Sequence, residues 1–272
     1  MKKDEIKNTI IQGDCGQVLK NFDNNIFDLI VTSPPYADSR KKIYGGPHPD
    51  EYVDWFLPKS KEFFRVLNPK GTFILNIKER VINGERHTYV LDLIKEMKEQ
   101  GWLWTEEYIW YKKNSYPGKW RNRFRDSWER CLQFNKRKDF KMYQDAVKIP
   151  IGDWSKKRFK EIKDYDKIRK ESSVGSGFGR KVDNWANKRK VYPNNVLQLS
   201  TECSNRNHAA TFPVILPEWF IKLFTLPKNL VLDPFAGSGT TGLAASNLNR
   251  RFVLIELKNE YVNLARERIS LH

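Results

Sequence analysis

Cysteine is scarce in this chain of 272 residues, and recognisable metal-binding patterns are missing from it. The three cysteines, Cys15, Cys131 and Cys203, lie far apart and form no C-x-x-C pair. An odd and dispersed set of this kind argues against a disulfide framework and against a structural zinc site. The four histidines show no ligand spacing either. We therefore expect no metal and a reduced, cytoplasmic setting.

Long apolar runs are missing as well. No stretch reaches the roughly 18 apolar residues that a membrane-spanning helix needs. The first residues, Met1 to Glu5, are charged where a secretory signal would be apolar, so we expect no membrane partner. Material for a large core is plentiful, because 39% of the residues are hydrophobic and 13% are aromatic.

The formal net charge of +16 is concentrated in one segment. Residues 111–190 hold 25 Lys and Arg against 10 Asp and Glu, whereas the rest of the chain holds 24 against 23. Lys and Arg bind phosphates without regard to sequence, so a neutral body with one basic segment favours a nucleic-acid partner. A basic surface that is merely solvated is the alternative.

Apolar patterning predicts an α/β domain. Short strands are expected over residues 9–14, 27–32, 72–77, 102–111, 129–135, 230–233 and 251–256. Helices are expected over residues 52–67, 87–100, 218–225, 239–247 and 259–269. The first of these helices should break or kink near Pro58, and residues 68–71 should form a turn. Residues 137–195 are polar and basic, which predicts an insert of low intrinsic order.

The stretch Thr32-Ser33-Pro34-Pro35-Tyr36 follows the apolar strand 27–32. Two prolines remove two backbone donors and fix φ, so the chain should leave the sheet as a rigid loop. Open α/β sheets place their chemistry at the carboxyl ends of parallel strands. A serine hydroxyl, a proline carbonyl and a tyrosine ring together suit a flat ligand that carries an amine. A strand terminator with a buried tyrosine is the alternative reading.

A glycine-rich loop follows the strand 230–233 and opens a helix. Gly237, Gly239 and Gly242 satisfy the pattern G-x-G-x-x-G, and Glu256 ends the next strand. This arrangement is typical of sites that bind a nucleoside next to a closely approaching backbone, although a tight strand-to-helix turn gives the same pattern.

The position of the glycine loop predicts the topology. The residues that follow it suffice for a helix, a strand and a second helix, so the other strands of the sheet must come from the N-terminal half. The fold is therefore expected to be circularly permuted. Its two candidate loops should follow adjacent strands of one sheet.

The order of these motifs is similar to the β group of the amino-methyltransferases of DNA that use S-adenosylmethionine. That resemblance implies a Rossmann-like methyltransferase sheet, circularly permuted, with an inserted basic target-recognition region. Residues 1–136 would form the catalytic half, 137–195 the target-recognition insert and 196–272 the S-adenosylmethionine-binding half. DNA would be the partner, and a restriction endonuclease that acts on the same sequence is a candidate second partner.

The resemblance also implies roles for single residues. Ser33, Pro34, Pro35 and Tyr36 would be catalytic, with Tyr36 stacking on a flipped-out base. The segment His208–Pro213 resembles the one that touches the methionine end of the cofactor, with Ala209 where the family more often has proline, and residues 109–114 resemble a segment that lines the target pocket. The implied cofactor-binding residues are Asp14, Thr32, Phe212, Pro213, Asp233, Phe235, Gly237, Gly239, Thr240, Thr241 and Glu256.

Basic residues interleaved with aromatic ones, as in Trp120 to Arg125, suit phosphate tracking combined with base stacking. The residues expected to bind DNA are Lys119, Arg121, Arg123, Arg125, Lys156, Lys157, Arg158, Arg180, Lys188 and Arg189.

Serine before the two prolines usually marks cytosine N4 as the target in this family, whereas aspartate or asparagine usually marks adenine N6. Ser33 therefore predicts a cytosine-N4 methyltransferase. Methylation at cytosine C5 needs a cysteine nucleophile, and no cysteine here follows a proline. Adenine N6, a catalytically inactive DNA-binding relative and a dinucleotide-dependent oxidoreductase remain alternatives.

Overall fold

The computed structural model describes residues 1–38, 45–115, 118–152, 189–201 and 212–270. The chain divides into two units, one made of Met1–Tyr143 with Asn195–His272 and the other of Gln144–Asn194. The smaller unit lies within the predicted insert 137–195.

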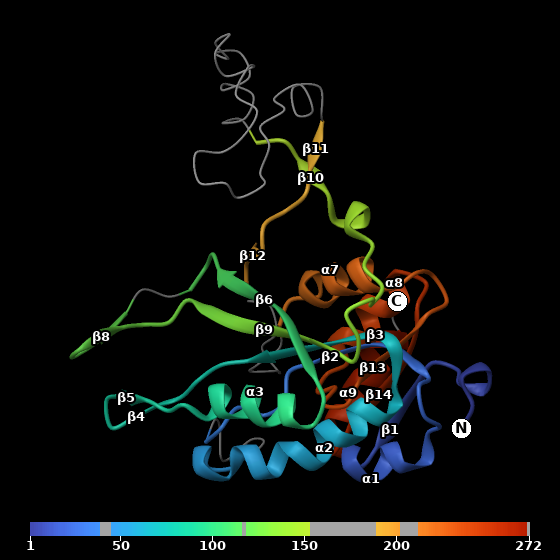
Figure 1. Ribbon diagram of the computed structural model, residues 1–272, viewed down its shortest axis with the longest axis horizontal. Coiled ribbons are helices and arrows are strands. Elements are labelled where there is room, and N and C mark those ends of the chain that lie inside the picture. The colour runs from blue at the N-terminus through green and yellow to red at the C-terminus, as the bar shows by residue number, and fades with distance from the viewer. Residues whose placement is uncertain (39–44, 116–117, 153–188, 202–211, 271–272) are drawn as a thin grey trace. The chain divides into compact units, whose positions relative to one another are not determined.

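Eight strands form one sheet in the larger unit, in the order β1–β14–β13–β2–β3–β9–β6–β12 (Figure 1). All neighbouring strands run parallel except that β9 is antiparallel to β3 and to β6. The strands are β1 (Thr9–Gln12), β2 (Phe27–Thr32), β3 (Leu67–Ile77), β6 (Leu103–Lys112), β9 (Trp128–Asn135), β12 (Val196–Leu199), β13 (Leu230–Asp233) and β14 (Arg251–Glu256).

The middle of this sheet brings the two ends of the chain together. β13 lies directly beside β2, with Val231 opposite Leu29 and Leu232 opposite Ile30. The prediction that the two candidate loops follow adjacent strands is therefore confirmed. Every residue of β2 and of β13 is buried, as expected for short apolar strands covered on both faces.

Helices cover both faces of the sheet (Figure 1). On one face, α1 (Cys15–Val18), α2 (Tyr52–Val66) and α3 (Tyr89–Glu99) pack side by side. On the other face lie α7 (Ile215–Phe224) and α8 (Thr240–Asn247), with α9 (Asn259–Ser270) beside α8. Helix α3 is amphipathic and buries an apolar stripe at helical spacing, made of Tyr89, Val90, Leu93, Ile94 and Met97.

Two local predictions need correction. Helix α2 continues through Pro58, so the break that was one of the two outcomes predicted there does not occur, and the kink stays a prediction. Burial of Phe56, Phe63 and Val66 on the core side of α2 outweighs the one backbone hydrogen bond that a proline removes. Strand β3 begins at Leu67, ahead of the predicted turn over residues 68–71, which is instead a bulge within the strand.

Several short elements were not predicted. Strand β12 completes the sheet beside β6, but only Leu197 of its four residues is buried, so its apolar signal is weak. Two hairpins, β4 (Val81–Ile82) with β5 (Glu85–Arg86) and β7 (Lys119–Trp120) with β8 (Arg123–Phe124), extend to the same side in Figure 1. The 3-10 helices are η1 (Lys3–Glu5), η2 (Leu19–Asn21), η3 (Pro49–Glu51) and η4 (Gln144–Val147).

In the smaller unit, β10 (Ile149–Pro150) pairs antiparallel with β11 (Lys190–Val191). The hydroxyl of Tyr192 donates to Asp145 at 2.9 Å in the same unit. No helix within the described residues combines the length and the apolarity that crossing a membrane requires.

Candidate active site

A cavity of about 850 Å³ opens at the carboxyl ends of the central parallel strands in the larger unit. Asp14 follows β1, Ser33 follows β2, Asp233 ends β13 and Glu256 ends β14, and all four line this cavity. The neighbouring strand β3 adds Asn76 near its own carboxyl end. The sheet thus gathers side chains that are up to 242 positions apart, between Asp14 and Glu256, around one space.

The proline loop is held at both of its ends. The hydroxyl of Thr32 donates to Asp233 Oδ1 at 2.6 Å, which ties the end of β2 to the end of β13. The buried hydroxyl of Tyr52, on α2, donates to the carbonyl of Pro35 at 3.1 Å. Since Pro34 and Pro35 also have fixed φ, Ser33 projects from a rigid backbone.

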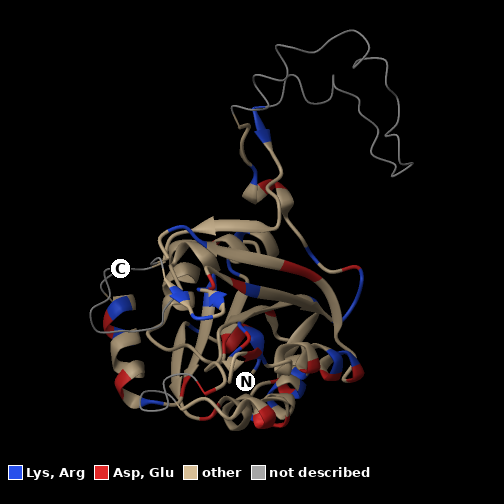
Figure 2. Cartoon of the chain, turned by 90° about the vertical axis from the view of Figure 1, so that its left-hand side faces the viewer, with Lys and Arg blue, Asp and Glu red and all other residues tan. Residues whose placement is uncertain are grey.

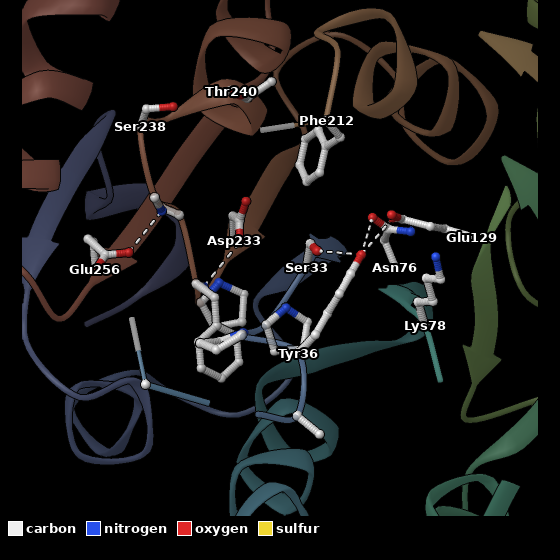
Figure 3. A pocket seen from close by; sticks show the side chains of 18 of the residues that line it. Ser33, Tyr36, Asn76, Lys78, Glu129, Phe212, Asp233, Ser238, Thr240 and Glu256 are labelled. Atoms are coloured by element: carbon white, nitrogen blue, oxygen red, sulfur yellow. Dashed lines mark hydrogen bonds between the residues drawn. The ribbon is translucent and has the colours of Figure 1, made fainter. Parts of the chain in front are cut away.

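The Tyr36 hydroxyl is the centre of a polar cluster at one end of the cavity (Figure 3). It donates to Glu129 Oε2 at 2.7 Å, lies 3.2 Å from Asn76 Oδ1 and accepts from Ser33 Oγ at 3.3 Å. Burial, followed by the negative charge of Glu129, raises the pKa of Tyr36 well above its ordinary value. The phenol therefore keeps its proton at neutral pH.

The opposite end of the cavity is formed by the glycine-rich loop. Gly237 has a φ of 51° and Gly239 a φ of 79°, a region that favours glycine. A Cβ at Gly239 would lie 2.8 Å from the Cβ of Ala265 on α9, so the close packing also requires glycine there. Gly237, which lines the cavity, thus presents bare backbone to it, as binding of a nucleoside would require, whereas Gly239 serves the packing against α9.

Asp233 is the buried anchor of this loop. Its carboxylate accepts from Thr32 and from the hydroxyl of Thr241, each at 2.6 Å, and from the backbone N–H of Phe235 at 3.1 Å. Desolvation raises the pKa of Asp233 to about 6, although the two hydroxyl donors favour the charged form. Thr32 and Thr241 therefore orient Asp233.

Glu256 lies beside the loop with a fixed orientation (Figure 3). Its Oε2 accepts from the backbone N–H of Gly237 and its Oε1 from that of Lys258, both at 2.9 Å. Each oxygen can accept a further hydrogen bond, because a carboxylate has about four lone-pair sites. Asp14 caps α1 by accepting from Gln17 N at 3.2 Å and also lines the cavity.

The predicted cofactor-binding residues fall into two groups. Those that line the cavity are Asp14, Phe212, Asp233, Phe235, Gly237, Thr240 and Glu256. Those described outside its lining are Thr32, Pro213, Gly239 and Thr241. His208 lies outside the described residues. The ring of Phe235 also packs against Trp55, Phe56 and Phe63 and so anchors the loop to α2.

Other residues of the cavity were not predicted from the sequence. Asn76 and Lys78 could have been found, because they end the strand next to the proline loop. Glu129 gave no signal, since it enters from the antiparallel strand β9 and belongs to no motif that the sequence shows. Trp110 and Lys112, on β6, belong to the segment 109–114 that was expected near the target pocket, and both line the cavity.

Cys15 lines the cavity at the end where Asp14 lies, and it is buried. Desolvation, with a contribution from the charge of Asp14, raises the pKa of Cys15 to about 12. It is therefore a neutral thiol near pH 7 and a poor nucleophile. Within the described part of the chain, no three His, Cys, Asp or Glu residues are grouped to hold a metal ion.

The residues predicted to bind DNA are partly described. Lys119, Arg121, Arg125 and Arg189 are exposed and Arg123 is half-buried, whereas Lys156, Lys157, Arg158, Arg180 and Lys188 lie outside the described residues. The β7–β8 hairpin also exposes Trp120 by 59% and Phe124 by 85%. Figure 2, seen from the hairpin side, shows blue Lys and Arg positions close to red acidic ones.

Asp126 joins the two hairpins. It pairs with Arg86 of β5, with Lys78 at 3.4 Å and with Arg123 of β8 at 3.9 Å. Burial alone would raise the pKa of Asp126, but the hydrogen bond from Arg86 and the charge of Lys78 hold it below its usual value. The β7–β8 hairpin is thereby anchored at the rim of the cavity.

Comparison with known proteins agrees with this geometry. Residues 27–267 match the family model for N6 and N4 methyltransferases, described as DNA methylase. The chain belongs to the DNA methylase family. This methylase is 32% identical to the Type II methyltransferase M.PvuII of Proteus hauseri, over 92% of its own length and 80% of that relative. It is 28% identical to M.SmaI of Serratia marcescens, over 96% and 90% of the two chains.

Solved structures show the same fold. The methylase aligns with the PvuII DNA methyltransferase, named as cytosine-N4-specific, with a TM-score of 0.72 and 28% identity over 97% and 86% of the two chains. It also aligns with a DNA modification methylase of Thermus thermophilus solved with S-adenosyl-L-methionine, at a TM-score of 0.63 and 22% identity over 97% and 93%. The predicted α/β methyltransferase sheet and the predicted enzyme class, a DNA methyltransferase, are therefore confirmed.

Proposed function

We propose that this methylase transfers a methyl group from S-adenosylmethionine to the exocyclic N4 of a cytosine in DNA. The observation that carries the proposal is Ser33, which lies on a rigid loop in the same cavity as the glycine-rich loop. The family, and the cytosine-N4 specificity named for a 28%-identical structure that aligns over 97% of this chain, support it.

The cavity can accommodate a cofactor and a base together. Its volume of about 850 Å³ lies near the upper end of the roughly 300–1,000 Å³ usual for small-molecule sites. The half lined by Gly237, Asp233 and Glu256 would hold the cofactor, with the Glu256 carboxylate accepting from ribose hydroxyls. S-adenosylmethionine bound there would supply a sulfonium methyl group as the electrophile.

The half lined by Ser33 and Tyr36 would hold the target base. An exocyclic amine is a weak nucleophile, because its lone pair is delocalised into the ring. Hydrogen bonds from the amine to Ser33 Oγ and to the Pro34 carbonyl would favour a pyramidal nitrogen, and placing it in line with the methyl group is catalysis by proximity. The nitrogen would gain the methyl group as the bond from the methyl carbon to sulfur breaks, which leaves the sulfur as a neutral thioether, and the nitrogen would then lose one proton to water.

The base would reach this cavity by flipping out of the duplex and stacking on Tyr36. The β7–β8 hairpin at the cavity rim has the composition of a DNA-contacting element, with exposed Lys119, Arg121 and Arg125 beside two exposed aromatic rings. The basic segment 137–195 would read the recognition sequence. A restriction endonuclease that cuts the same sequence is the expected partner. The proposal also includes a circularly permuted methyltransferase fold, in which the catalytic loop precedes the cofactor loop along the chain.

The test is mass spectrometry of nucleosides from DNA incubated with the enzyme and S-adenosylmethionine. We expect N4-methylcytosine, and none from the variant Ser33→Ala with Tyr36→Ala. N6-methyladenine without N4-methylcytosine would overturn the choice of base. Sequencing of the modified DNA then locates the methylated sites.

A further inference from the structure

Glu129, the second residue of β9, is a buried carboxylate at the edge of the cavity. A buried charge is costly unless it is paired and hydrogen-bonded. Glu129 is both, because its Oε1 pairs with the ammonium of Lys112 on β6 and its Oε2 accepts from Tyr36 at 2.7 Å. The loop after β2 and the neighbouring strands β6 and β9 thus meet at one side chain.

These contacts fix the direction of a hydrogen-bond chain. An ammonium can only donate and a carboxylate can only accept, and the amide oxygen of Asn76, 3.2 Å from the phenol, is a second acceptor. Tyr36 therefore donates its single proton on this side of the ring, and Glu129 is the nearer acceptor at 2.7 Å. The phenol oxygen of Tyr36 then accepts from Ser33 Oγ at 3.3 Å. The one proton of Ser33 is committed to Tyr36, and only the oxygen lone pairs of Ser33 are left for a ligand. Figure 3 shows Ser33, Tyr36 and Glu129 in this sequence of contacts.

We propose that Glu129 is a positioning residue that, through Tyr36, makes Ser33 Oγ a hydrogen-bond acceptor and so selects a base with an amino group. Uracil and thymine carry an oxygen in place of the cytosine amine, and that oxygen would face the lone pairs of Ser33. This inference rests on the proposed function, because Ser33 must contact the target base.

The first test compares Glu129→Gln, Tyr36→Phe and the double variant. Glutamine has the shape of glutamate but can turn a donor toward Tyr36, which removes the fixed direction. We expect each single variant to lower kcat by about 10- to 100-fold, the range for removal of a hydrogen bond to a charged group, with unchanged cofactor affinity. The double variant should be no slower than Tyr36→Phe, because both changes break one chain.

The second test measures binding without turnover. Oligonucleotides built on a mapped site carry either cytosine or uracil at the target position, opposite the same guanine. The quantity compared is the dissociation constant for uracil divided by that for cytosine. We expect this ratio to be at least fivefold lower in Glu129→Gln than in wild type. The easier flipping of a mismatched base affects wild type and variant alike, so it cancels in this comparison.

Asp28→Asn provides the matched control. Asp28 is also a buried carboxylate paired with a lysine, Lys3 at 2.7 Å, but it lies at the far end of β2 from Ser33. The substitution Asp28→Asn should lower the stability of the fold. It should leave the ratio of the dissociation constants for uracil and cytosine unchanged.

An unchanged ratio in Glu129→Gln, or additive losses in the double variant, would overturn the inference. Failure of the proposed function looks different. If wild type methylates adenine, the same comparison is made with adenine and hypoxanthine, and selection of an amine by Glu129 is still tested.

Discussion

Single side chains at this site are arranged by contacts that reach across the sheet. Asp233 is 1% exposed, and its carboxylate depends on hydroxyls from β2 and from α8. In the folded protein Asp233 has a pKa of about 6, whereas in the unfolded chain its ordinary pKa is 3.8. As the pH rises, the unfolded chain therefore loses this proton at a lower pH than the folded protein does. The stabilisation from this group is complete below pH 3.8 and is lost as the pH rises through about 6.

Asp233→Asn should therefore gain stability relative to wild type as the pH rises. A shift of about two pKa units corresponds to roughly 3 kcal/mol, so the difference in unfolding free energy should change by about that amount between pH 4 and pH 7. Urea unfolding of both proteins across this range measures it. A difference that does not vary with pH would show that Asp233 titrates normally.

Site residues were predictable where a motif ran along the chain. Ser33, Asp233 and Glu256 were identified because each one ends or follows a short apolar strand, and the carboxyl ends of parallel strands meet. Glu129 was not assigned a role, because it enters from β9, whose pairing with β3 the sequence pattern does not specify. Lys112 was expected near the target pocket only through the resemblance of residues 109–114.

At the scale of elements, the hairpins differ from the strands of the sheet. The long strands follow from apolar runs, whereas β7 and β8 have two residues each and expose their aromatic rings. The guanidinium of Arg123 lies over Trp120, 5.2 Å from its ring centre, and the same side chain pairs with Asp126 at 3.9 Å. An exposed ring held in place in this way is suited to stacking on a base.

Phe124→Ala should weaken DNA binding by roughly 5- to 150-fold, since stacking on one base is worth about 1–3 kcal/mol. Stability should change by less than about 0.5 kcal/mol, because the ring is exposed by 85%. Fluorescence anisotropy with labelled duplex DNA and thermal unfolding measure the two quantities. The control is Trp104→Ala, which removes an exposed aromatic ring at the start of β6, the end away from Lys112, and should leave the affinity for DNA unchanged. Equal losses of affinity in the two variants would contradict a role for the hairpin.

At the scale of the whole molecule, charge is distributed unevenly along the chain. The excess of Lys and Arg lies in residues 111–190, which include the β7–β8 hairpin and most of the smaller unit. Each phosphate neutralised by a protein cation adds about −0.9 to the slope of log affinity against log salt concentration. The salt dependence of DNA binding should therefore depend more on where the positive charge lies than on its total.

Replacing Lys156, Lys157 and Arg158 by glutamine should reduce the magnitude of that slope by roughly 0.9 for each phosphate that the variant no longer neutralises. Replacing Lys61, Lys95 and Lys98, three exposed lysines on α2 and α3, removes the same charge and should leave the slope nearly unchanged. Titrations of duplex DNA at several salt concentrations measure both. Equal slopes of log affinity against log salt concentration in the two variants would mean that only the net charge of the protein sets the salt dependence of DNA binding.

Taken by itself, the sequence determined where two rigid loops lie and which strands carry them. Apolar runs, paired prolines and spaced glycines act locally, and a positive φ or a missing backbone donor constrains the chain wherever it folds. Only the tertiary structure decided which side chains complete the cavity. Tyr36 acquires its partners Asn76 and Glu129 from β3 and β9 because those strands pair antiparallel in one particular register, and that register depends on packing across the whole sheet.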